Sequence, residues 1–207
     1  MNSLELKYQS TMIQGEFNLK SLNFLLVFQV NCPGCFFYAL PLFNKLFSDV
    51  NLKEYSFLGL STAFEDFDYN TTKNTELLCS EGILVGETKK ALESHGYHSI
   101  PYQLDFPVAM DYEMNSSDSS VALIERICRL NPNFKIWPDW EQEAMRQKVE
   151  SYLDQLERIS YTFTANQLKG TPSLIVFDEN YQVQAKWFGH VTYEEVITSL
   201  SKLDLIK

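Results

Sequence analysis

The sequence predicts an α/β fold in which a central mixed β-sheet is flanked by helices. Residues 24–30 and 173–177 are apolar runs of strand length, and such runs suit central strands buried on both faces. Residues 35–50 follow the first run directly and carry apolar side chains at helical spacing. The strand candidate at residues 54–61 completes a β-α-β unit, and this unit indicates the fold class.

Further helices and strands are expected along the rest of the chain. Pro41 should kink the helix at residues 35–50, because its ring removes one backbone donor. Gly96 is a natural C-cap for the helix before it. The turn at residues 178–180 predicts an antiparallel hairpin. The other predicted helices are 75–95, 121–130, 137–160 and 192–203, and the other predicted strands are 12–22 (a strand or a turn), 106–110 and 182–188.

Residues 112–160 differ in character from the strand-rich remainder. They hold a polar linker followed by two amphipathic helical patterns. Their apolar positions are too few to predict a core of their own. We therefore expect one domain over residues 1–207, in which residues 112–160 form a helical insertion ahead of the strand at residues 173–177.

The composition excludes several classes of partner. The chain has 207 residues, 27 of them acidic and 17 basic, with a formal net charge of −10. Such a charge repels phosphate backbones and anionic lipid surfaces, so neither nucleic acid nor a membrane is an expected partner. No basic region with a following apolar stretch begins the sequence, so we expect a cytoplasmic protein.

The sequence Cys32-Pro33-Gly34-Cys35 stands where the first strand passes directly into a helix. A thiol at a helix N-terminus has its thiolate stabilised by unpaired backbone N–H groups and by the helix dipole. The thiolate is the attacking species in thiol–disulfide exchange, and a second thiol one turn on can resolve the mixed disulfide. We therefore assign Cys32 as the nucleophile and Cys35 as the resolving thiol of a thiol–disulfide oxidoreductase.

A structural zinc site is the alternative use of such a cysteine pair. It would need a second pair of ligands, but Cys79 and Cys128 are paired neither with each other nor with a histidine. Both lie in amphipathic, helical surroundings, where a cysteine acts as a small buried hydrophobe. We expect no metal and no cofactor.

Two segments together resemble the thioredoxin superfamily: Phe-Gln-Val-Asn-Cys-Pro-Gly-Cys at residues 28–35 and Gly-Thr-Pro-Ser-Leu-Ile-Val-Phe-Asp at residues 170–178. The arrangement is most similar to the redoxin branch, which contains TlpA-like reductases and the AhpC/TSA-related peroxiredoxins. The resemblance covers residues 12–111 and 161–203. It implies a thioredoxin-like fold interrupted by the helical insertion.

The resemblance also implies a substrate groove. In the family, an X-Pro dipeptide before a core strand is cis and faces the CxxC motif, and here Thr171 and Pro172 match it. Their backbone would bind an extended substrate strand. Expected partners are protein or small-molecule thiols and disulfides, with a thioredoxin reductase-type electron donor. Asn31 departs from the Trp common in the family, and Leu26 replaces a buried carboxylate, so no acid–base relay is assigned.

Two other functions stay open at this point. A peroxiredoxin-like thiol peroxidase would carry a Pro-x-x-x-Thr-x-x-Cys pocket, but Leu25 and Gln29 stand at its Pro and Thr positions. A non-catalytic partner-binding module could use the insertion to dock a partner. The intact CxxC motif favours the oxidoreductase, which in a cytosolic setting would be a reductase.

Overall fold

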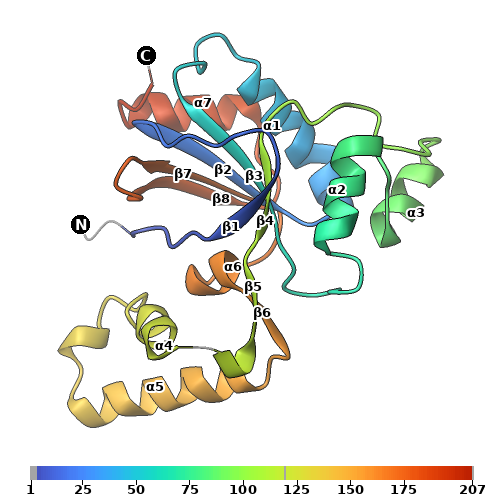
Figure 1. The fold of residues 1–207 in the computed structure, drawn as a ribbon. Coiled ribbons are helices and arrows are strands. Elements are labelled where there is room, and N and C mark those ends of the chain that lie inside the picture. Colours follow the sequence, from blue (N-terminus) through green and yellow to red (C-terminus); the bar gives the residue numbers. More distant parts are fainter. Residues whose placement is uncertain (1–3, 119, 207) are drawn as a thin grey trace.

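The fold is seen in a computed structural model that describes residues 4–118 and 120–206; residues 1–3, 119 and 207 lie outside the described part. A six-stranded mixed sheet of order β1-β4-β3-β2-β7-β8 forms its centre (Figure 1). The predicted α/β class with a mixed sheet is confirmed. The strands of this sheet are β1 (Ser10–Gln14), β2 (Leu22–Phe28), β3 (Ser56–Ser61), β4 (Val108–Asp111), β7 (Ser173–Asp178) and β8 (Val183–Phe188).

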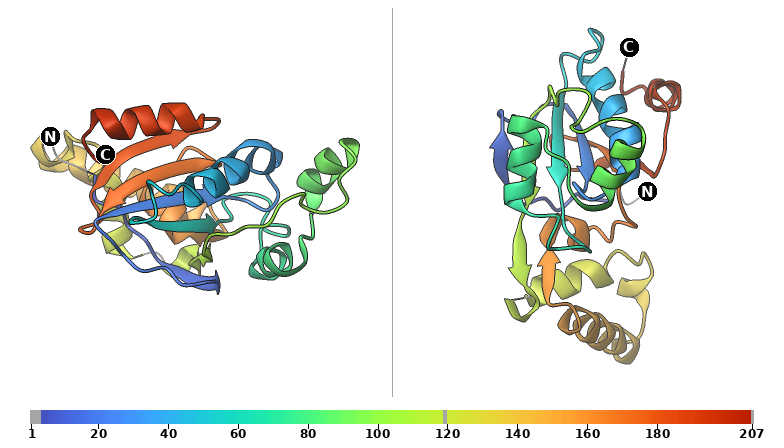
Figure 2. Two further views of the ribbon diagram at one scale, coloured as in Figure 1. Left: turned by 90° about the horizontal axis from the view of Figure 1, so that it is seen from above. Right: turned by 90° about the vertical axis from the view of Figure 1, so that its right-hand side faces the viewer.

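Helices cover one face of the sheet, and an N-terminal segment and a short helix cover the other (Figure 2). Within residues 4–118 and 120–206, no helix is both long and apolar enough to cross a membrane. The helices are η1 (Cys35–Ala39, a π-helical turn), α1 (Leu40–Phe47), α2 (Thr72–Glu81), α3 (Gly86–Ser94), α4 (Val121–Cys128), α5 (Asp139–Asp154), α6 (Tyr161–Ala165) and α7 (Tyr193–Lys202).

β2 is the central strand and is buried along its whole length. Phe24, Leu26 and Phe28 pack on the face covered by α1 and α7, whereas Leu25 and Val27 pack on the opposite face. This alternation follows from the two-residue period of a strand, and it explains why residues 24–28 are all apolar. β2 runs parallel to β3 and antiparallel to β7. The predicted antiparallel hairpin of β7 and β8 is also observed.

The helix after β2 begins with a π-helical turn. The N–H of Leu40 donates to the carbonyl of Cys35, five residues back, and Pro41 lies in the first turn of α1. Proline has no N–H to continue an α-helical ladder at this point, and a π-turn is one of the ways in which a helix accommodates such a break. The π-helical turn thus lies directly before α1, and the kink expected at Pro41 stays a prediction.

The prediction of one helix over residues 75–95 is wrong, because the structure has two helices there. Gly82 ends α2 in a left-handed conformation with φ +69°, which an α-helix cannot continue. Gly86, with φ +52°, then opens α3 against the side chain of Asn31. A Cβ at Gly86 would lie 2.1 Å from Asn31 Oδ1, so the close approach requires glycine. Gly96 follows the end of α3, as predicted.

The prediction of a helix over residues 137–160 is also wrong at its C-terminal end. α5 ends at Asp154, and β6 (Arg158–Ser160) then pairs antiparallel with β5 (Glu113–Asn115). Each of these strands is three residues long, which is too short for a periodic signal in the sequence. The pairing closes the insertion at its base and was not predicted.

The insertion has an apolar cluster of its own, contrary to expectation. It forms a lobe on one side of the sheet (Figure 1), in which α4 packs on α5. The assignment of residues 1–207 to a single domain stays a prediction. The buried members of the cluster are Leu123, Ile124, Ile127, Cys128, Phe134, Val149, Leu153, Ile159 and Ala165.

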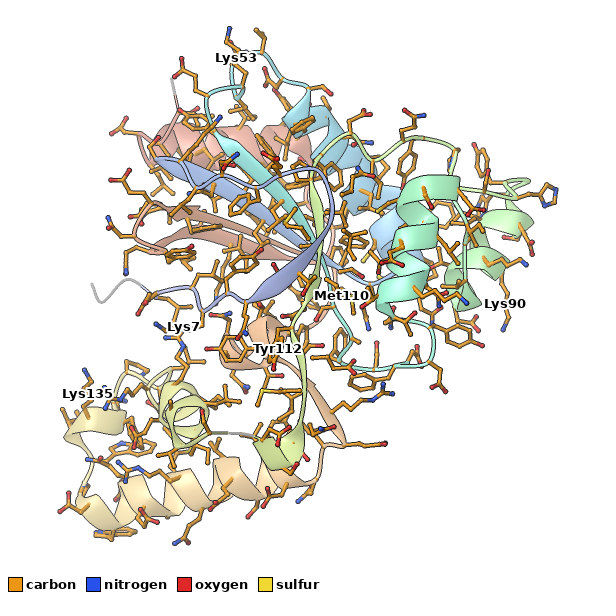
Figure 3. All side chains as sticks on the ribbon, in the orientation of Figure 1. Lys7, Lys53, Lys90, Met110, Tyr112 and Lys135 are labelled. Atoms are coloured by element: carbon orange, nitrogen blue, oxygen red, sulfur yellow. The ribbon has the colours of Figure 1, made fainter. Side chains whose placement is uncertain are left out.

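Asp111 is the last residue of β4 and connects the sheet to the segment that enters the lobe; its chain neighbours Met110 and Tyr112 are labelled in Figure 3. Its buried carboxylate accepts hydrogen bonds from the hydroxyl of Thr62 at 2.9 Å and from the backbone N–H groups of Thr162 and Phe163 at 2.8 and 3.0 Å. Burial raises the pKa of Asp111 to about 6, although these hydrogen bonds act to lower it. The carboxylate thus joins β4, the segment after β3 and the start of α6.

We predict that Phe43→Ala destabilises the protein strongly. Phe43 holds α1 on the sheet through edge contacts with Phe57 and Phe106, with ring centroids 5.5 and 4.7 Å away. Removing this buried ring leaves a cavity, so the free energy of unfolding should fall by about 3–5 kcal/mol in a denaturant titration. Val50→Ala, at a side chain that is 68% exposed, is the control and should change it by less than about 0.5 kcal/mol. Equal effects would show that α1 is not held by this ring.

Candidate active site

The two cysteines of the motif lie at the start of the helix that follows β2. Pro33 and Gly34 are helical, and the N–H of Cys35 donates to the carbonyl of Cys32 at 2.9 Å. Proline suits a first helical position, because its missing N–H would have no partner there. Cys32 is partly exposed and Cys35 is fully buried. Both are free thiols, with their Sγ atoms 2.7 Å apart.

The surroundings of the two thiols separate their pKa values. The pKa of Cys32 is lowered to about 6, chiefly by a hydrogen bond from the Cys35 thiol, which outweighs the effect of burial. The side chain of Thr171 and then the backbone N–H groups of Cys35 and Gly34 lower it further, and the N–H of Cys35 lies 3.3 Å from Cys32 Sγ. Burial, and then the hydrogen bond to Cys32, raise the pKa of Cys35 well above its usual value. One thiol is therefore poised as a thiolate, and the other is kept protonated.

The Thr171–Pro172 dipeptide faces the motif across the end of the sheet. Its peptide bond is cis, and the carbonyl oxygen of Thr171 lies 3.8 Å from Cys32 Sγ. The two segments meet because β2 and β7 are antiparallel neighbours in which Val27 pairs with Ser173. The structure thus places this dipeptide beside Cys32 and Cys35, although it lies more than 130 residues further along the chain.

Pro172 borders a small hollow beside the motif. Tyr38, His190 and Leu26 contribute to its lining, and the ring centroids of Tyr38 and His190 are 4.7 Å apart. Leu26 is 2% exposed and occupies the strand position where thioredoxins have a carboxylate. The lining of this hollow is therefore mainly apolar.

Gln29 is one polar residue at the site that the sequence did not assign. It is buried at the end of β2, where its amide oxygen accepts from the hydroxyl of Thr171 at 3.0 Å. Its amide nitrogen donates to the carbonyl of Glu65 at 3.3 Å. A polar side chain directly after the apolar residues 24–28 was the available signal.

Asn31 is the second such residue, noted in the sequence only as a departure from Trp. Its side-chain nitrogen donates to Asp66 at 2.8 Å, and its side-chain oxygen accepts from the N–H of Glu87 at 2.6 Å. Its own N–H donates to the side chain of Asn70 at 2.9 Å. Asn31 therefore ties the segment before Cys32 to the loop after β3 and to the start of α3.

Cys79 and Cys128 are the two cysteines outside the CxxC motif; Cys79 is partly buried and Cys128 is buried. Cys128 belongs to the apolar cluster of the lobe, and Cys79 packs against the main core. Burial raises the pKa of both thiols, that of Cys79 to about 11. Among residues 4–118 and 120–206, no three His, Cys, Asp or Glu side chains are grouped so that they could hold a metal ion.

Comparison with known proteins supports the fold. No family model matches the sequence. The comparison with curated proteins found no match either. Among solved structures, a thiol-disulfide isomerase from Corynebacterium glutamicum matches with a TM-score of 0.58 and 20% identity, over 98% of this chain and 96% of that one. A thioredoxin-like superfamily protein matches with a TM-score of 0.48 and 20% identity, over 96% of each chain. StoA from Bacillus subtilis matches with a TM-score of 0.44 and 13% identity, over 93% of this chain and 94% of that one.

The chain thus has a thioredoxin-like fold with a helical insertion. The thioredoxin-like fold expected from the sequence is therefore confirmed.

We predict that alkylation of Cys32 by iodoacetamide is half-maximal near pH 6 in the reduced protein. The rate rises with pH because only the thiolate reacts, and the pKa of Cys32 is lowered to about 6. In Cys35→Ala the main hydrogen bond to the thiolate is lost, so the midpoint should move up toward about 8.5. Mass spectrometry of the labelled peptide assigns the reacting residue. Equal midpoints in the two proteins would contradict the assigned cause.

Proposed function

We propose that the protein is a thiol–disulfide oxidoreductase of the redoxin type that acts as a reductase. The observation that carries the proposal is the contact of a partly exposed, low-pKa Cys32 with a buried Cys35 at a helix start. A reactive thiolate and a protected partner are the two groups that disulfide exchange requires. In a reducing compartment such as the cytoplasm, the dithiol form would predominate and pass electrons to substrates.

The exchange proceeds in two displacements. The Cys32 thiolate attacks one sulfur of the substrate disulfide, an S–S bond forms between them, and the other substrate sulfur leaves as a thiolate that takes a proton from water. Cys35 then loses its proton and attacks Cys32 Sγ, which releases the second substrate thiolate. The products are a Cys32–Cys35 disulfide and a substrate dithiol, so two electrons pass to the substrate.

The burial of Cys35 gives this sequence its order. Its pKa is raised while Cys32 is an adjacent thiolate, so it does not compete for the first attack. Once Cys32 is part of a mixed disulfide, the neighbouring negative charge is gone and ionisation of Cys35 becomes easier. Cys35 thus acts after the substrate has bound.

Substrate would lie along Thr171 and Pro172. The Thr171 carbonyl beside Cys32 can accept a hydrogen bond from an extended peptide, as in the addition of a strand to a sheet. Protein disulfides fit this arrangement, and small disulfides can reach the partly exposed sulfur. A thioredoxin reductase-type protein is the proposed electron donor that returns the oxidised pair to the dithiol.

A thiol peroxidase is not favoured. The two positions before Cys32 that would carry the Pro and Thr of its pocket hold Leu25 and Gln29, both buried, and the Gln29 amide is bonded to Thr171 and Glu65. Among the described residues of the lobe, 112–118 and 120–160, no feature singles out a non-catalytic docking role.

We predict that the reduced protein cleaves the disulfides of insulin with dithiothreitol as electron donor, and that Cys32→Ser abolishes this activity. Cys35→Ser should keep the first displacement and accumulate a mixed disulfide, visible as a mass adduct on Cys32 that dithiothreitol removes. Cys79→Ser, at a thiol outside the site, is the matched control and should keep wild-type turnover. Activity that survives in Cys32→Ser would disprove the assignment, and consumption of hydrogen peroxide by wild type would favour the peroxidase.

A further inference from the structure

A cleft between the end of α4 and β8 is lined by basic side chains. Its volume is about 790 Å³, and the N-terminal segment at Leu4 and Glu5 forms part of its wall. A smaller hollow of about 220 Å³ adjoins it, because Gln167 and Lys186 line both. Among the described residues, Glu5 is the one acidic side chain that lines the two hollows. Their basic side chains are Arg126, Arg129, Lys135, Lys169 and Lys186.

The two hollows follow β8 toward the dithiol motif. Lys186 pairs with Ile175, whose side chain packs on the sheet face opposite α1 and α7, so Lys186 lies on that face as well. Phe188 is two residues further along the strand, about 7 Å, and lines the smaller hollow on the same face. A Cβ at Gly170 would lie 2.9 Å from the Phe188 ring. Since Gly170 directly precedes Thr171, the smaller hollow ends beside the dipeptide that faces the motif.

Neighbouring carboxylates do not cancel the positive charge of this lining. Within residues 4–118 and 120–206, none of Lys135, Lys169 and Lys186 forms an ion pair. Arg126 donates to two backbone carbonyls at 3.1 and 2.6 Å and to the amide oxygen of Asn166 at 3.2 Å. These oxygens are neutral, so they satisfy N–H groups of the guanidinium but leave its charge in place.

The carboxylates at the cleft are already engaged by other cations. Glu5 accepts from Lys7 at 2.5 Å, and Glu125 accepts from Arg129 at 3.2 Å and from Arg146. A chain with a net charge of −10 therefore holds a local positive site. At physiological salt, charges more than about 8 Å apart are largely screened, so an anion in the cleft interacts mainly with this basic lining.

We propose that this cleft binds an acidic stretch of the polypeptide whose disulfide the Cys32–Cys35 pair reduces. This substrate class rests on the proposed oxidoreductase function. The carbonyl of Thr171 would bind the segment around the disulfide, and the basic lining would bind carboxylates that flank that segment. The cleft thus selects substrates by the charge of the sequence next to their disulfide.

The form of the cleft suits a polypeptide better than other anions. Its cations come from α4, the loop after α4, the segment before Thr171 and β8, so they are arranged for a chain of carboxylates rather than for one compact anion. Leu4, Leu130 and Pro132 add apolar wall that can pack against peptide side chains. A nucleic acid would extend its phosphates beyond the cleft, where the acidic surface of the chain repels them.

Fluorescence anisotropy tests the binding site with a labelled, cysteine-free peptide rich in glutamate. The reference peptide has glutamine at every glutamate position and should bind much more weakly. Lys135→Glu/Lys186→Glu should weaken binding of the glutamate peptide by about tenfold, because two exposed charge contacts are reversed. The control, Lys53→Glu/Lys148→Glu, changes the net charge equally at exposed lysines outside the cleft and should have less than about a twofold effect. Lys53 and Lys135 lie at opposite ends of the molecule in Figure 3.

Equal binding of the two peptides, or an equal loss in the control variant, would overturn the proposal. Tighter binding of an oligothymidylate than of the glutamate peptide would overturn it in favour of a nucleic-acid site. Should the cleft variant fail to fold, carbodiimide cross-linking of the glutamate peptide to wild type still decides. Mass spectrometry should locate the cross-links on Lys135, Lys169 or Lys186, and cross-links confined to other lysines would contradict the proposal.

Turnover separates this inference from the proposed function. The substrates are two peptides with the same disulfide loop, flanked by glutamates in one and by glutamines in the other. Wild type should reduce the glutamate form with a KM about tenfold lower and a similar kcat, and Lys135→Glu/Lys186→Glu should lose this preference. Reduction of both peptides with equal KM would overturn the inference and leave the oxidoreductase standing. Binding of the glutamate peptide in the cleft without reduction of either substrate would refute the proposed function and leave the acidic-peptide site standing.

Discussion

The antiparallel pairing of β2 with β7 is the constraint on which the rest of the site depends. β2 is buried on both faces, and a slip of its register by one residue would exchange the side chains that pack on these two faces. That register pairs Val27 with Ser173, and the segments that continue from the two strands therefore meet at one edge of the sheet. The contact of Cys32 with Thr171 follows from this pairing, and the start of η1 then sets the two sulfur atoms side by side.

The electrostatics of the site come from local donors. The hydrogen bond from Cys35 and the N–H groups at the helix start stabilise the Cys32 thiolate, while burial keeps Cys35 protonated. Gln29 and Asn31 flank these groups and bind them to the loop after β3. The base of the insertion packs on that same loop, since Ser160 hydrogen-bonds Ala63 in both directions and Phe64 stacks on Phe163. The base of the insertion therefore contacts the loop after β3, and this loop in turn hydrogen-bonds the side chains of Gln29 and Asn31.

The sequence predicted those elements whose signal is local and strong. The apolar runs located β2, β3 and β7, although β2 begins and ends two residues earlier than expected, and the CxxC motif located the thiols. The break at Gly82 was misjudged, because a single glycine is compatible with a helix or with its end. The β5–β6 pair and the contact of Gln29 with Thr171 depend on partners more than 40 residues away, which a single sequence does not reveal.

A redox titration of the Cys32–Cys35 pair tests whether these two thiols form the redox-active dithiol. The protein is equilibrated in glutathione or dithiothreitol buffers of graded potential, the free thiols are trapped by alkylation, and the oxidised fraction is read by mass spectrometry. We predict one two-electron transition confined to these two cysteines. Its potential should lie between that of thioredoxin, about −270 mV, and that of a strong oxidant, about −120 mV, and nearer to the first for a reductase. Failure to form the Cys32–Cys35 disulfide at any potential, or a transition that involves Cys79 or Cys128 instead, would contradict it.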